Sequence, residues 1–513
     1  MSNANDNPWL EYFLTPSEKD HFAGWKEVLR DRSVINPMME PVFDFFSRLV
    51  PDNVAPNVLT LSGAFAIIQA WYFCFLFFDS DPTLVCAVSA ASILVFWLAG
   101  GIDGKHAART MNDTSFGALF KYVSDLISSV FLVIVLCELL SSEKNLVDQW
   151  YCVQTAQLVL LLKHYSAFMR EAGLRFIWIG PGEMVAWVIG VLVISGFLGL
   201  GWLKALYSYT WGVCCNHLVD TMNLDPQGYF ATMAPARATY ISVFVLALCR
   251  IASSVSYKRH TWTRNSLLLI LGLRALNFIT RIVISAVGKT TERDVIFDGL
   301  FMAMTTSDLI VSKMANRELH SYVVVMASMV VLPHLQFLII CFVVFYWITV
   351  FGDLMHHLNI PLLQVCRNVY CDGIYDLCHV GHKNLFRRAL KHGNRLLVGV
   401  VGDADANAYK RPPIMTAAER ESEVANCKCV TKVIPNAPCF GMTMEFIQQH
   451  RIHVVAFGQE YLDRFPNPDD DPYYKVPRKL GIATPMPRTN DISTSDLIKR
   501  IQDRGKDDKK SPT

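Results

Sequence analysis

Long apolar runs dominate the chain between residues 58 and 352, and they constrain its fold more than any other feature. A helix that crosses a membrane needs about 20 consecutive, mainly apolar residues. Overall, 52% of the residues are hydrophobic and only 18% are charged, which is a balance typical of integral membrane proteins. The sequence therefore predicts a polytopic α-helical membrane domain over residues 58–360.

About ten segments have this character, so we expect about ten transmembrane helices. Lys163 and Asp308 are among the charged residues that interrupt two of the weaker segments. The predicted segments cover residues 58–78, 83–100, 117–140, 152–169, 184–206, 237–256, 265–288, 295–314, 319–333 and 334–352.

The first 57 residues differ from the apolar part. Their beginning is polar and acidic, without the basic region and apolar core of a secretory signal peptide. Within residues 39–49, apolar side chains recur at helical intervals beside charged ones. This pattern predicts an interfacial helix at the membrane surface, and an ordinary surface helix is an equally good interpretation.

Residues 366–503 have the composition of a soluble domain. The apolar runs VYCDG, RLLVGVVGD and HVVAFG alternate with the helical patterns GHKNLFRRALKHG and TAAERESEVANC. Strands that alternate with helices predict a parallel α/β sheet. Residues 504–513 are highly charged, and we expect a disordered tail there.

Charge and cysteine usage exclude two other classes of protein. The net charge is only +2, which argues against a broad nucleic-acid-binding surface. The 14 cysteines are scattered without any C-x-x-C spacing, which favours reduced thiols and a cytosol-facing soluble part over a disulfide framework.

Two histidines stand three residues apart at the start of a predicted helix, in CDGIYDLCHVGHKNLF. The spacing of His379 and His382 puts both rings on one face of the first helical turn, where N–H groups and the helix dipole favour phosphate. Imidazoles in this place can stabilise the charge that develops in phosphoryl or nucleotidyl transfer. Structural histidines at a helix cap are the alternative, and zinc would need further ligands that no suitably spaced Cys or His supplies.

A second phosphate-binding pattern lies near the C-terminus, in PRTNDISTSDLIKRI. Ser493, Thr494 and Ser495 precede an apolar helical run, which predicts a helix N-cap and by itself nothing more. Arg488 adds a rigid guanidinium fork that suits phosphate. Lys410, in the loop after a strand, is a third candidate cation.

These stretches, taken in order, resemble the cytidylyltransferases that make CDP-choline, CDP-ethanolamine and CDP-glycerol. The resemblance covers about residues 367–503 and includes VYCDGIYDLCHVGH, LLVGVVGD, the lysine before MTAAER, VIPNAP and RTNDISTSDLI. It implies a Rossmann-like nucleotidyltransferase fold. In that family the phosphate of a phospho-alcohol attacks the α-phosphorus of CTP, pyrophosphate leaves, and Mg²⁺ accompanies the nucleotide.

The resemblance also implies roles for individual residues. The catalytic residues would be His379, His382, Lys410 and Arg488. Nucleotide would be bound by Gly373, Ile374, Tyr375, Gly381, Thr489, Ile492, Ser493 and Thr494. The alcohol would lie near Asp372 and Tyr461. The two histidines would stabilise the pentavalent state, the lysine would bridge the phosphates, and the arginine would hold the triphosphate.

The identity of the alcohol is left open by the motifs. Choline-specific relatives place an aromatic residue after the AP of VxxAPW, where it suits a quaternary ammonium, but this chain has Cys439 followed by Phe440. KRPPIMT and DDDPYYKVPRKLG look more like the ethanolamine-phosphate enzymes, whereas ISTSD looks more like the choline-phosphate enzymes. FGQE at 457–460 departs from the His-Gly or His-Asp of the family. We expect phosphoethanolamine, with phosphocholine as the alternative.

A charged stretch, GGIDGKHAARTMNDTSFGALFKYVSD at residues 100–125, lies between two apolar runs. Its spacing resembles the CDP-alcohol phosphotransferase signature, Asp-x2-Asp-Gly-x2-Ala-Arg-x8-Gly-x3-Asp-x3-Asp, and DGKHAART resembles the DGKQARRT of eukaryotic choline/ethanolamine phosphotransferases. Supporting matches are APN at 55–57, His164, LRF at 174–176, Glu183 and TTSDLIVSKM near 305–314. The chain thus resembles a fusion of such a membrane domain, over about 25–368, with a cytidylyltransferase.

In the phosphotransferase family, four aspartates hold divalent ions that bind the CDP diphosphate while the hydroxyl of diacylglycerol attacks. Here Gly100 and Lys121 replace the first and third aspartates, and Ala108 fills the arginine position. Lys121 lies four residues before Asp125, so its ammonium can pair with that carboxylate where an ion would sit. We expect a degenerate site formed by Asp103, Gly104, Arg109, Gly117, Lys121, Asp125, His164 and Glu183, with Asp103 and Asp125 as metal ligands only if the site is active.

The combined resemblance implies CTP, a phospho-alcohol and a membrane lipid such as diacylglycerol as ligands, in a homodimer without nucleic acid. It implies an endoplasmic-reticulum membrane with the C-terminal domain in the cytosol, where CTP is found. Three functions follow. The expected one is a membrane-anchored cytidylyltransferase with an inactive phosphotransferase-like domain. The others are a bifunctional enzyme, and a cytidylyltransferase whose membrane half is a scaffold or dimerisation module.

Overall fold

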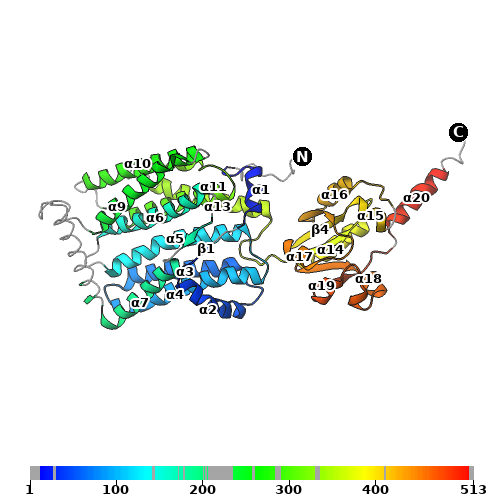
Figure 1. The fold of residues 1–513 in the computed structure, drawn as a ribbon, viewed down its shortest axis with the longest axis horizontal. Coiled ribbons are helices and arrows are strands. Elements are labelled where there is room, and N and C mark those ends of the chain that lie inside the picture. Colours follow the sequence, from blue (N-terminus) through cyan, green and yellow to red (C-terminus); the bar gives the residue numbers. More distant parts are fainter. Residues whose placement is uncertain are drawn as a thin grey trace. The chain divides into compact units, whose positions relative to one another are not determined.

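The structure is a computed structural model, and its contacts divide the chain into two compact units (Figure 1). The first unit holds residues 1–108 and 113–358, and the second holds residues 109–112 and 359–513. The structure describes residues 12–26, 30–140, 145–170, 173–176, 180–199, 201–202, 205, 235–256, 260–283, 290–329, 336–409, 412–490 and 492–507.

The described part of the first unit is almost entirely helical. Its long helices are α3 (Pro56–Phe77), α4 (Pro82–Arg109), α5 (Ser115–Leu140), α6 (Leu146–Met169), α7 (Pro181–Leu198), α9 (Pro235–Ala252), α10 (Thr261–Val283), α11 (Glu292–Met314) and α13 (Gln336–Leu358). Shorter elements are α1 (Pro16–Gly24), α2 (Ile35–Leu49), η2 (Ser253–Ser256), α12 (Ser321–Met329) and the strand pair β1 (Arg30–Asp31) and β2 (Arg175–Phe176).

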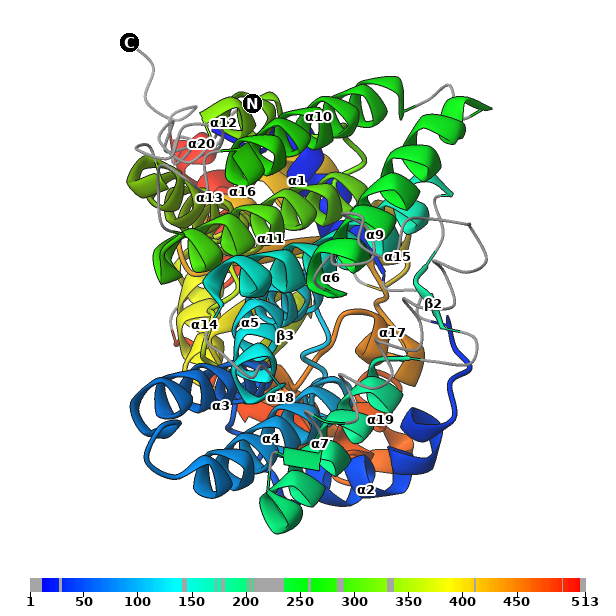
Figure 2. The same cartoon turned by 90° about the vertical axis from the view of Figure 1, so that its left-hand side faces the viewer.

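Helix α11 forms the centre of this bundle, among α5, α6 and α13 (Figure 2). Its most apolar window is 83% buried, far more than that of any other candidate span in the described residues. The hydroxyls of Thr305, Thr306 and Ser307 donate to backbone carbonyls one turn earlier, at 2.8–3.0 Å. Polar side chains can therefore be buried in this helix without losing their hydrogen bonds.

Seven of the described helices are long and apolar enough to cross a membrane: α3, α4, α5, α7, a helical stretch from Ala236 to Val255, α11 and α13. A helical apolar domain is confirmed, but the expected number of about ten spans is not. Some of the predicted segments, such as 184–206 and 265–288, run partly into residues that lie outside the described ranges.

Helix α2 includes the segment predicted to lie at the membrane surface. Phe43 is buried beneath Gly101 of α4, where an added Cβ would come within 2.5 Å of the phenyl ring. On other sides Met38, Phe45 and Leu49 are 71%, 60% and 63% exposed. The helix is thus held against α4 by Phe43 and by the ion pairs of Lys105 with Glu40 and Asp44, and it leaves an apolar surface uncovered.

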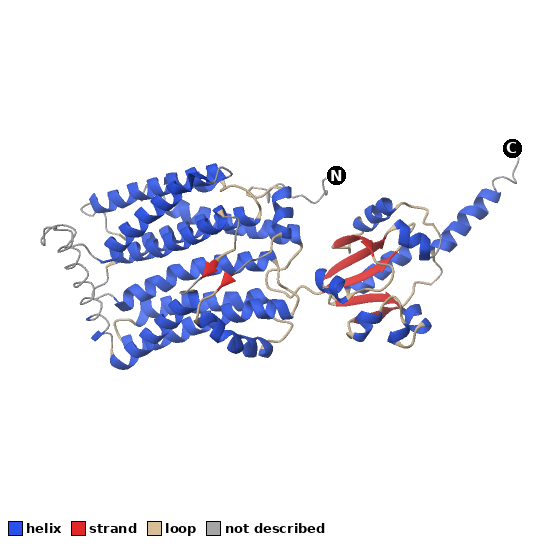
Figure 3. Cartoon of the chain, in the orientation of Figure 1, coloured by secondary structure: helices blue, strands red, loops and turns tan. Residues whose placement is uncertain are grey.

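The second unit is a five-stranded parallel sheet with helices on both faces (Figure 3). Its strands are β3 (Asn368–Gly373), β4 (Arg395–Val401), β5 (Lys432–Ala437), β6 (Val454–Gly458) and β7 (Ala483–Met486). Its helices are α14 (Val380–Leu390), α15 (Asp403–Tyr409), α16 (Ala417–Ala425), α17 (Met444–Gln449), α18 (Gln459–Arg464), η6 (Pro468–Asp470), α19 (Lys475–Lys479) and α20 (Thr494–Asp507). The predicted parallel α/β sheet is confirmed.

The spatial order of the strands, β5-β4-β3-β6-β7, fixes where a ligand can bind. From β3 the chain adds β4 and then β5 on one side of β3. It then crosses to the other side of β3, where it adds β6 and β7. In sheets of this kind the ligand crevice lies at the carboxyl ends of the strands, where the direction reverses. Successive side chains of β3 point to opposite faces of the sheet. Val369 and Cys371 pack in the hydrophobic core on one face, and Tyr370 packs in the core on the other.

The charged C-terminal segment differs from its prediction. Helix α20 runs as far as Asp507, so residues 504–507 are helical and not disordered, while residues 508–513 lie outside the described ranges. The helix continues through Gly505, a poor helix former, which lies between Arg504 and Lys506, two good ones.

Candidate active site

A cavity of about 380 Å³ opens at the carboxyl ends of β3 and β6. It is lined by every described residue that the sequence predicted for the soluble site: Asp372, Gly373, Ile374, Tyr375, His379, Gly381, His382, Tyr461, Arg488, Thr489, Ile492, Ser493 and Thr494. Lys410 was also predicted, but it lies outside the described residues. Three separate stretches of sequence thus meet around one cavity.

The two histidines stack on each other at the start of α14. Their ring centroids are 3.9 Å apart and the ring planes are inclined by 24°. His379 is the N-cap residue with extended backbone, and its Nδ1 accepts a hydrogen bond from the N–H of Gly381 at 3.1 Å. His379 precedes the helix, so the three-residue spacing alone does not place its ring beside that of His382. The N-cap conformation of His379 contributes as well.

The cap also fixes the tautomer of His379. Since Nδ1 accepts, the neutral ring carries its proton on Nε2, which lies 3.5 Å from the hydroxyl oxygen of Thr494. Burial and then the charge of Arg488 lower the pKa of His379, with Asp496 opposing. The ring is therefore neutral at pH 7 and presents an N–H donor toward the cavity.

Close packing around the histidines explains the glycine between them. A Cβ on Gly381 would come within 2.9 Å of the His379 ring. Tyr375 and Leu377, in the preceding turn, have positive φ angles of 55° and 52°. The edge of Tyr375 supports the His382 ring at 5.2 Å. Backbone strain of this kind persists where the surrounding structure holds it, often at functional sites.

The hydroxyl-rich start of α20 has the predicted capping pattern. Ser493 accepts from the backbone N–H of Asp496 at 3.1 Å, and the Ser493 hydroxyl lies 2.5 Å from the Asp496 carboxylate. The Thr494 hydroxyl donates to the Asp376 carbonyl at 3.2 Å, which ties this helix to the turn before His379. Arg488 lines the same cavity and is exposed to solvent. The cavity therefore carries N–H donors, hydroxyls and a guanidinium that suit phosphate.

The far end of the cavity combines a carboxylate with aromatic rings. Asp372 accepts from the Tyr474 hydroxyl at 2.9 Å. Burial raises the pKa of the Asp372 carboxyl to about 6, although the hydrogen bond from Tyr474 opposes this. The Tyr461 ring lies 5.1 Å and 5.2 Å from the rings of Tyr473 and Tyr474. Carboxylate and aromatic faces together favour a cation such as an ammonium group.

Some residues of this end were not singled out from the sequence. They are Tyr473 and Tyr474, which line the cavity together with Cys439, Phe457 and Glu460 of the stretches discussed above. The tyrosine pair in DDDPYYKVP could have been found from the sequence, because two adjacent aromatic residues in a charged loop are unusual and indicate a binding or packing role. Phe457, where the enzymes that the sequence resembles have histidine, packs on Tyr474 with ring centroids 4.9 Å apart.

In the helical unit, Lys121 lies where the resemblance would place a metal ligand. Its Nζ donates to Asp103 Oδ1 at 2.6 Å and to the carbonyl of Gly100 at 2.5 Å. The other carboxylate oxygen of Asp103 accepts from Thr60 at 2.7 Å. These bonds join the lysine of α5 to Asp103 on α4, and the pairing with Asp125 on the same helix stays a prediction. Across the described residues, no three His, Cys, Asp or Glu side chains are grouped to hold a metal ion, so this site does not fit a two-metal centre.

The other residues predicted for the membrane site are spread over several elements. His164, on α6, is half-buried with its ring edge-on to Tyr122 at 5.5 Å. Glu183 caps two helices, because its carboxylate accepts from the N–H groups of Val34 and Ile35 at 2.6 and 2.7 Å and from Gly180 at 2.8 Å. The remaining predicted residues lie on two helices: Gly104 and Arg109 on α4, and Gly117 and Asp125 on α5.

Residues 370–500 match the family model described as cytidylyltransferase-like. Choline-phosphate cytidylyltransferase 2 of Arabidopsis thaliana is 39% identical over 136 residues, which cover 26% of this chain and 44% of that protein. Ethanolamine-phosphate cytidylyltransferase of Dictyostelium discoideum is 36% identical over 137 residues, or 26% and 38% of the two chains. Human choline-phosphate cytidylyltransferase A is 39% identical over 135 residues, or 26% and 36%. The chain spans less than half the length of these relatives, and the similarity lies in its C-terminal domain.

Proposed function

We propose that this chain is a membrane-anchored cytidylyltransferase. Its C-terminal domain is similar to the cytidylyltransferases of choline phosphate and ethanolamine phosphate. It converts CTP and phosphoethanolamine to CDP-ethanolamine and pyrophosphate for phospholipid synthesis. The observation that carries the proposal is the single cavity in which the stacked His379 and His382 meet Arg488 and the N-terminus of α20.

In the proposed reaction, a phosphate oxygen of phosphoethanolamine attacks the α-phosphorus of CTP, and the bond to the leaving pyrophosphate breaks. The Nε2–H of His379 donates to an equatorial oxygen as negative charge builds up, and His382 acts beside it. Arg488, Ser493 and Thr494 hold the triphosphate, and Lys410 bridges the phosphates. Mg²⁺ would accompany CTP and, when bound, would neutralise phosphate charge.

Phosphoethanolamine is favoured by the composition of the far end of the cavity. A primary ammonium donates three hydrogen bonds, and Asp372 and Glu460 both present carboxylate oxygens there. A quaternary ammonium makes no such bonds and depends on aromatic faces, yet Cys439 is small and not aromatic. Phosphocholine remains the alternative substrate, supported by the three tyrosines of this end.

We further propose that the helical unit is a CDP-alcohol phosphotransferase-like domain that is inactive as a metal enzyme. The ion pair of Lys121 with Asp103, at 2.6 Å, supports this, because an ammonium group stands among the positions that metal-binding carboxylates would occupy. A bifunctional enzyme that also transfers the phospho-alcohol to diacylglycerol is the second candidate, and a scaffold or dimerisation module is the third. By the same resemblance, the protein is a homodimer in the endoplasmic-reticulum membrane, with the C-terminal domain in the cytosol.

One incubation tests substrate and function together. Purified full-length protein is given MgCTP, equal phosphoethanolamine and phosphocholine, and diacylglycerol, and the products are identified by mass spectrometry. We expect CDP-ethanolamine and pyrophosphate to accumulate without a phospholipid product. CDP-choline as the main product would favour the alternative substrate, and a phospholipid would favour the bifunctional enzyme. If neither CDP-alcohol forms, the proposed function is wrong.

The pH dependence of substrate binding should report on Asp372. Because the pKa of its carboxyl is about 6, the group is ionised above that pH and neutral below it. An ionised carboxylate attracts the ammonium of phosphoethanolamine, so KM for this substrate should rise as pH falls through 6, by about tenfold per unit in the acid range. Asp372→Asn should give a high KM with a smaller change through pH 6, because only the phosphate of the substrate, whose second pKa is also about 6, then titrates there. An unchanged pH profile in this variant would show that another group controls binding.

A further inference from the structure

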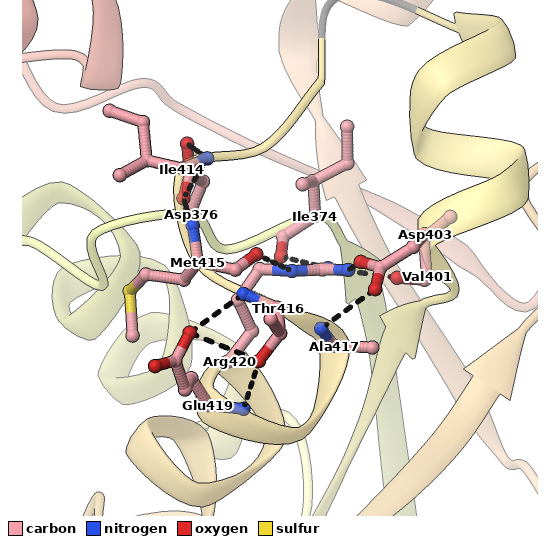
Figure 4. A network of polar contacts seen from close by, with 10 residues as sticks. All are labelled: Ile374, Asp376, Val401, Asp403, Ile414, Met415, Thr416, Ala417, Glu419 and Arg420. Atoms are coloured by element: carbon pink, nitrogen blue, oxygen red, sulfur yellow. Dashed lines mark hydrogen bonds and ion pairs between the residues drawn. The ribbon is translucent and has the colours of Figure 1, made fainter.

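Arg420 is fully buried at the carboxyl edge of the sheet, and its guanidinium is hydrogen-bonded on every nitrogen (Figure 4). Nη1 donates to the carbonyls of Ile374 at 2.7 Å and Val401 at 2.8 Å. Nη2 donates to the Asp403 carboxylate at 2.6 Å, and Nε donates to the Met415 carbonyl at 3.2 Å. A single side chain thus joins the turn after β3, the end of β4 with the start of α15, and the loop before α16.

Each of these three segments forms part of the cavity wall. Ile374, Val401 and Pro413 line the cavity, while the side chain of Arg420 is not among the lining groups. A buried charge must keep its acceptors, since leaving it without them would be costly. The planar guanidinium also requires its acceptors at fixed directions. The three wall segments are therefore held in one arrangement by a residue that does not itself face the cavity.

A second set of contacts connects this arrangement to the phosphate-binding end. The Asp376 carboxylate accepts from the backbone N–H groups of Ile414 and Met415 at 3.1 and 3.0 Å. The carbonyl of Asp376 accepts from the hydroxyl of Thr494, at the start of α20. Asp403 accepts in addition from the N–H of Ala417 at 3.1 Å. Moving the loop before α16 would therefore also move the turn that precedes His379.

We propose that Arg420 is a positioning residue for the nucleotide. It holds the wall segments that border Ile374 and the loop after Lys410, so that CTP finds its binding groups already in place. This inference rests on the proposed function, because it assumes that CTP is the ligand of that side of the cavity. It assigns no contact between Arg420 and substrate, and it predicts that loss of the guanidinium weakens CTP binding without affecting the alcohol end.

The same domain offers a matched control in Arg478. The side chain of this arginine is only 6% exposed, and its guanidinium donates to the carbonyls of Phe465 and Pro466 at 2.7 and 2.9 Å and to Asp471 at 2.9 Å. Asp471 in turn accepts from the backbone N–H of Tyr474, whose hydroxyl binds Asp372. Arg478 therefore holds the segments at the alcohol end of the cavity by the same kind of multiple hydrogen bonding as Arg420.

The experiment compares Arg420→Lys with Arg478→Lys in the full-length protein. Lysine keeps the charge but presents its donors from one atom, so it cannot reach four acceptors in different segments. For Arg420→Lys we expect CTP affinity, measured by calorimetry with the nucleotide alone, to fall on the order of 10- to 100-fold, as misplacement of about 1 Å can cause. KM for phosphoethanolamine should stay within about threefold. Arg478→Lys should show the reverse pattern.

Thermal unfolding shows whether each variant is folded, and Asp403→Asn provides a milder test. This substitution removes one acceptor charge at a residue whose side chain is 48% exposed, so the fold should be kept while CTP affinity decreases. Unchanged CTP affinity in folded Arg420→Lys and Asp403→Asn would overturn the inference, as would an equal loss for both substrates. Wild-type protein that binds CTP but transfers no cytidylyl group would refute only the proposed function. Wild-type protein that does not bind CTP would refute both.

Discussion

Replacing His379 by alanine is expected to lower kcat for CDP-ethanolamine formation by about 10²–10³-fold, the usual loss when one donor to a developing charge is removed. The Nε2–H of His379 faces the cavity because Nδ1 is occupied by the N–H of Gly381. Its hydrogen bond strengthens as charge builds up on the phosphoryl oxygens. KM for CTP should therefore change much less than kcat, since the lost interaction acts mainly in the transition state.

His392 provides the control for this substitution. It is an exposed histidine of the same domain, located just after α14 and outside the cavity lining. His392→Ala should leave both kcat and KM within about twofold of the wild type, as surface substitutions away from a site usually do. Activity of His379→Ala within a few-fold of wild type would show that this histidine only caps the helix. The measurement is initial-rate pyrophosphate release at saturating phosphoethanolamine.

The side chains proposed to be catalytic could be predicted from sequence because they lie in short continuous patterns. His379 and His382 are three residues apart, and Ser493 directly precedes its helix, so local rules of helix capping identify both places. The alternation of β3 between the two cores of its sheet likewise follows from the strand's own residues. Local information was enough wherever the partners of a residue are its neighbours in sequence.

Arg420 shows where such reasoning stops. It lies in TAAERESEVANC, which has the pattern of a solvated helix with charged residues on its outer face. Its burial depends on the meeting of Ile374, Val401 and Met415, which are 46, 19 and 5 residues away. No periodicity in the helix signals that meeting. Glu183 is similar, because its bond to Val34 spans 149 residues.

The partner of Lys121 illustrates the same limit within the membrane motif. Spacing along one helix suggests the i+4 residue, Asp125, but gives no sign of the hydrogen bond that Lys121 donates to Asp103 on α4. A helix pair places residues that are 18 positions apart as close as one turn would. The chemistry of the site could be inferred from residue types, but the bond between Lys121 and Asp103 depends on how the fold places α4 and α5, which spacing along one helix does not give.

Replacing Gly100 and Lys121 together by aspartate is expected to make the thermal stability of the helical unit depend on a divalent cation. The two introduced carboxylates join those of Asp103 and Asp125, so that all four acidic positions of the phosphotransferase signature are filled in register. Space is available, because nothing lies within 4 Å of a Cβ built on Gly100. Carboxylate oxygens are the ligands that Mg²⁺ and Mn²⁺ prefer.

Ion binding to the folded state alone would stabilise this variant by about 2.7 kcal/mol at an ion concentration 100 times the dissociation constant. The readout is the unfolding temperature in detergent, with MnCl₂ or with EDTA, which requires no enzymatic activity. Gly100→Asn with Lys121→Asn is the matched control, since it has nearly the same shape and no added charge. Wild-type protein and this control should not respond to the ion, because the Lys121 ammonium or a neutral amide stands in its place. A response of the wild type equal to that of the aspartate variant would mean that Lys121 does not exclude metal, and the domain would then have to be considered as an active phosphotransferase.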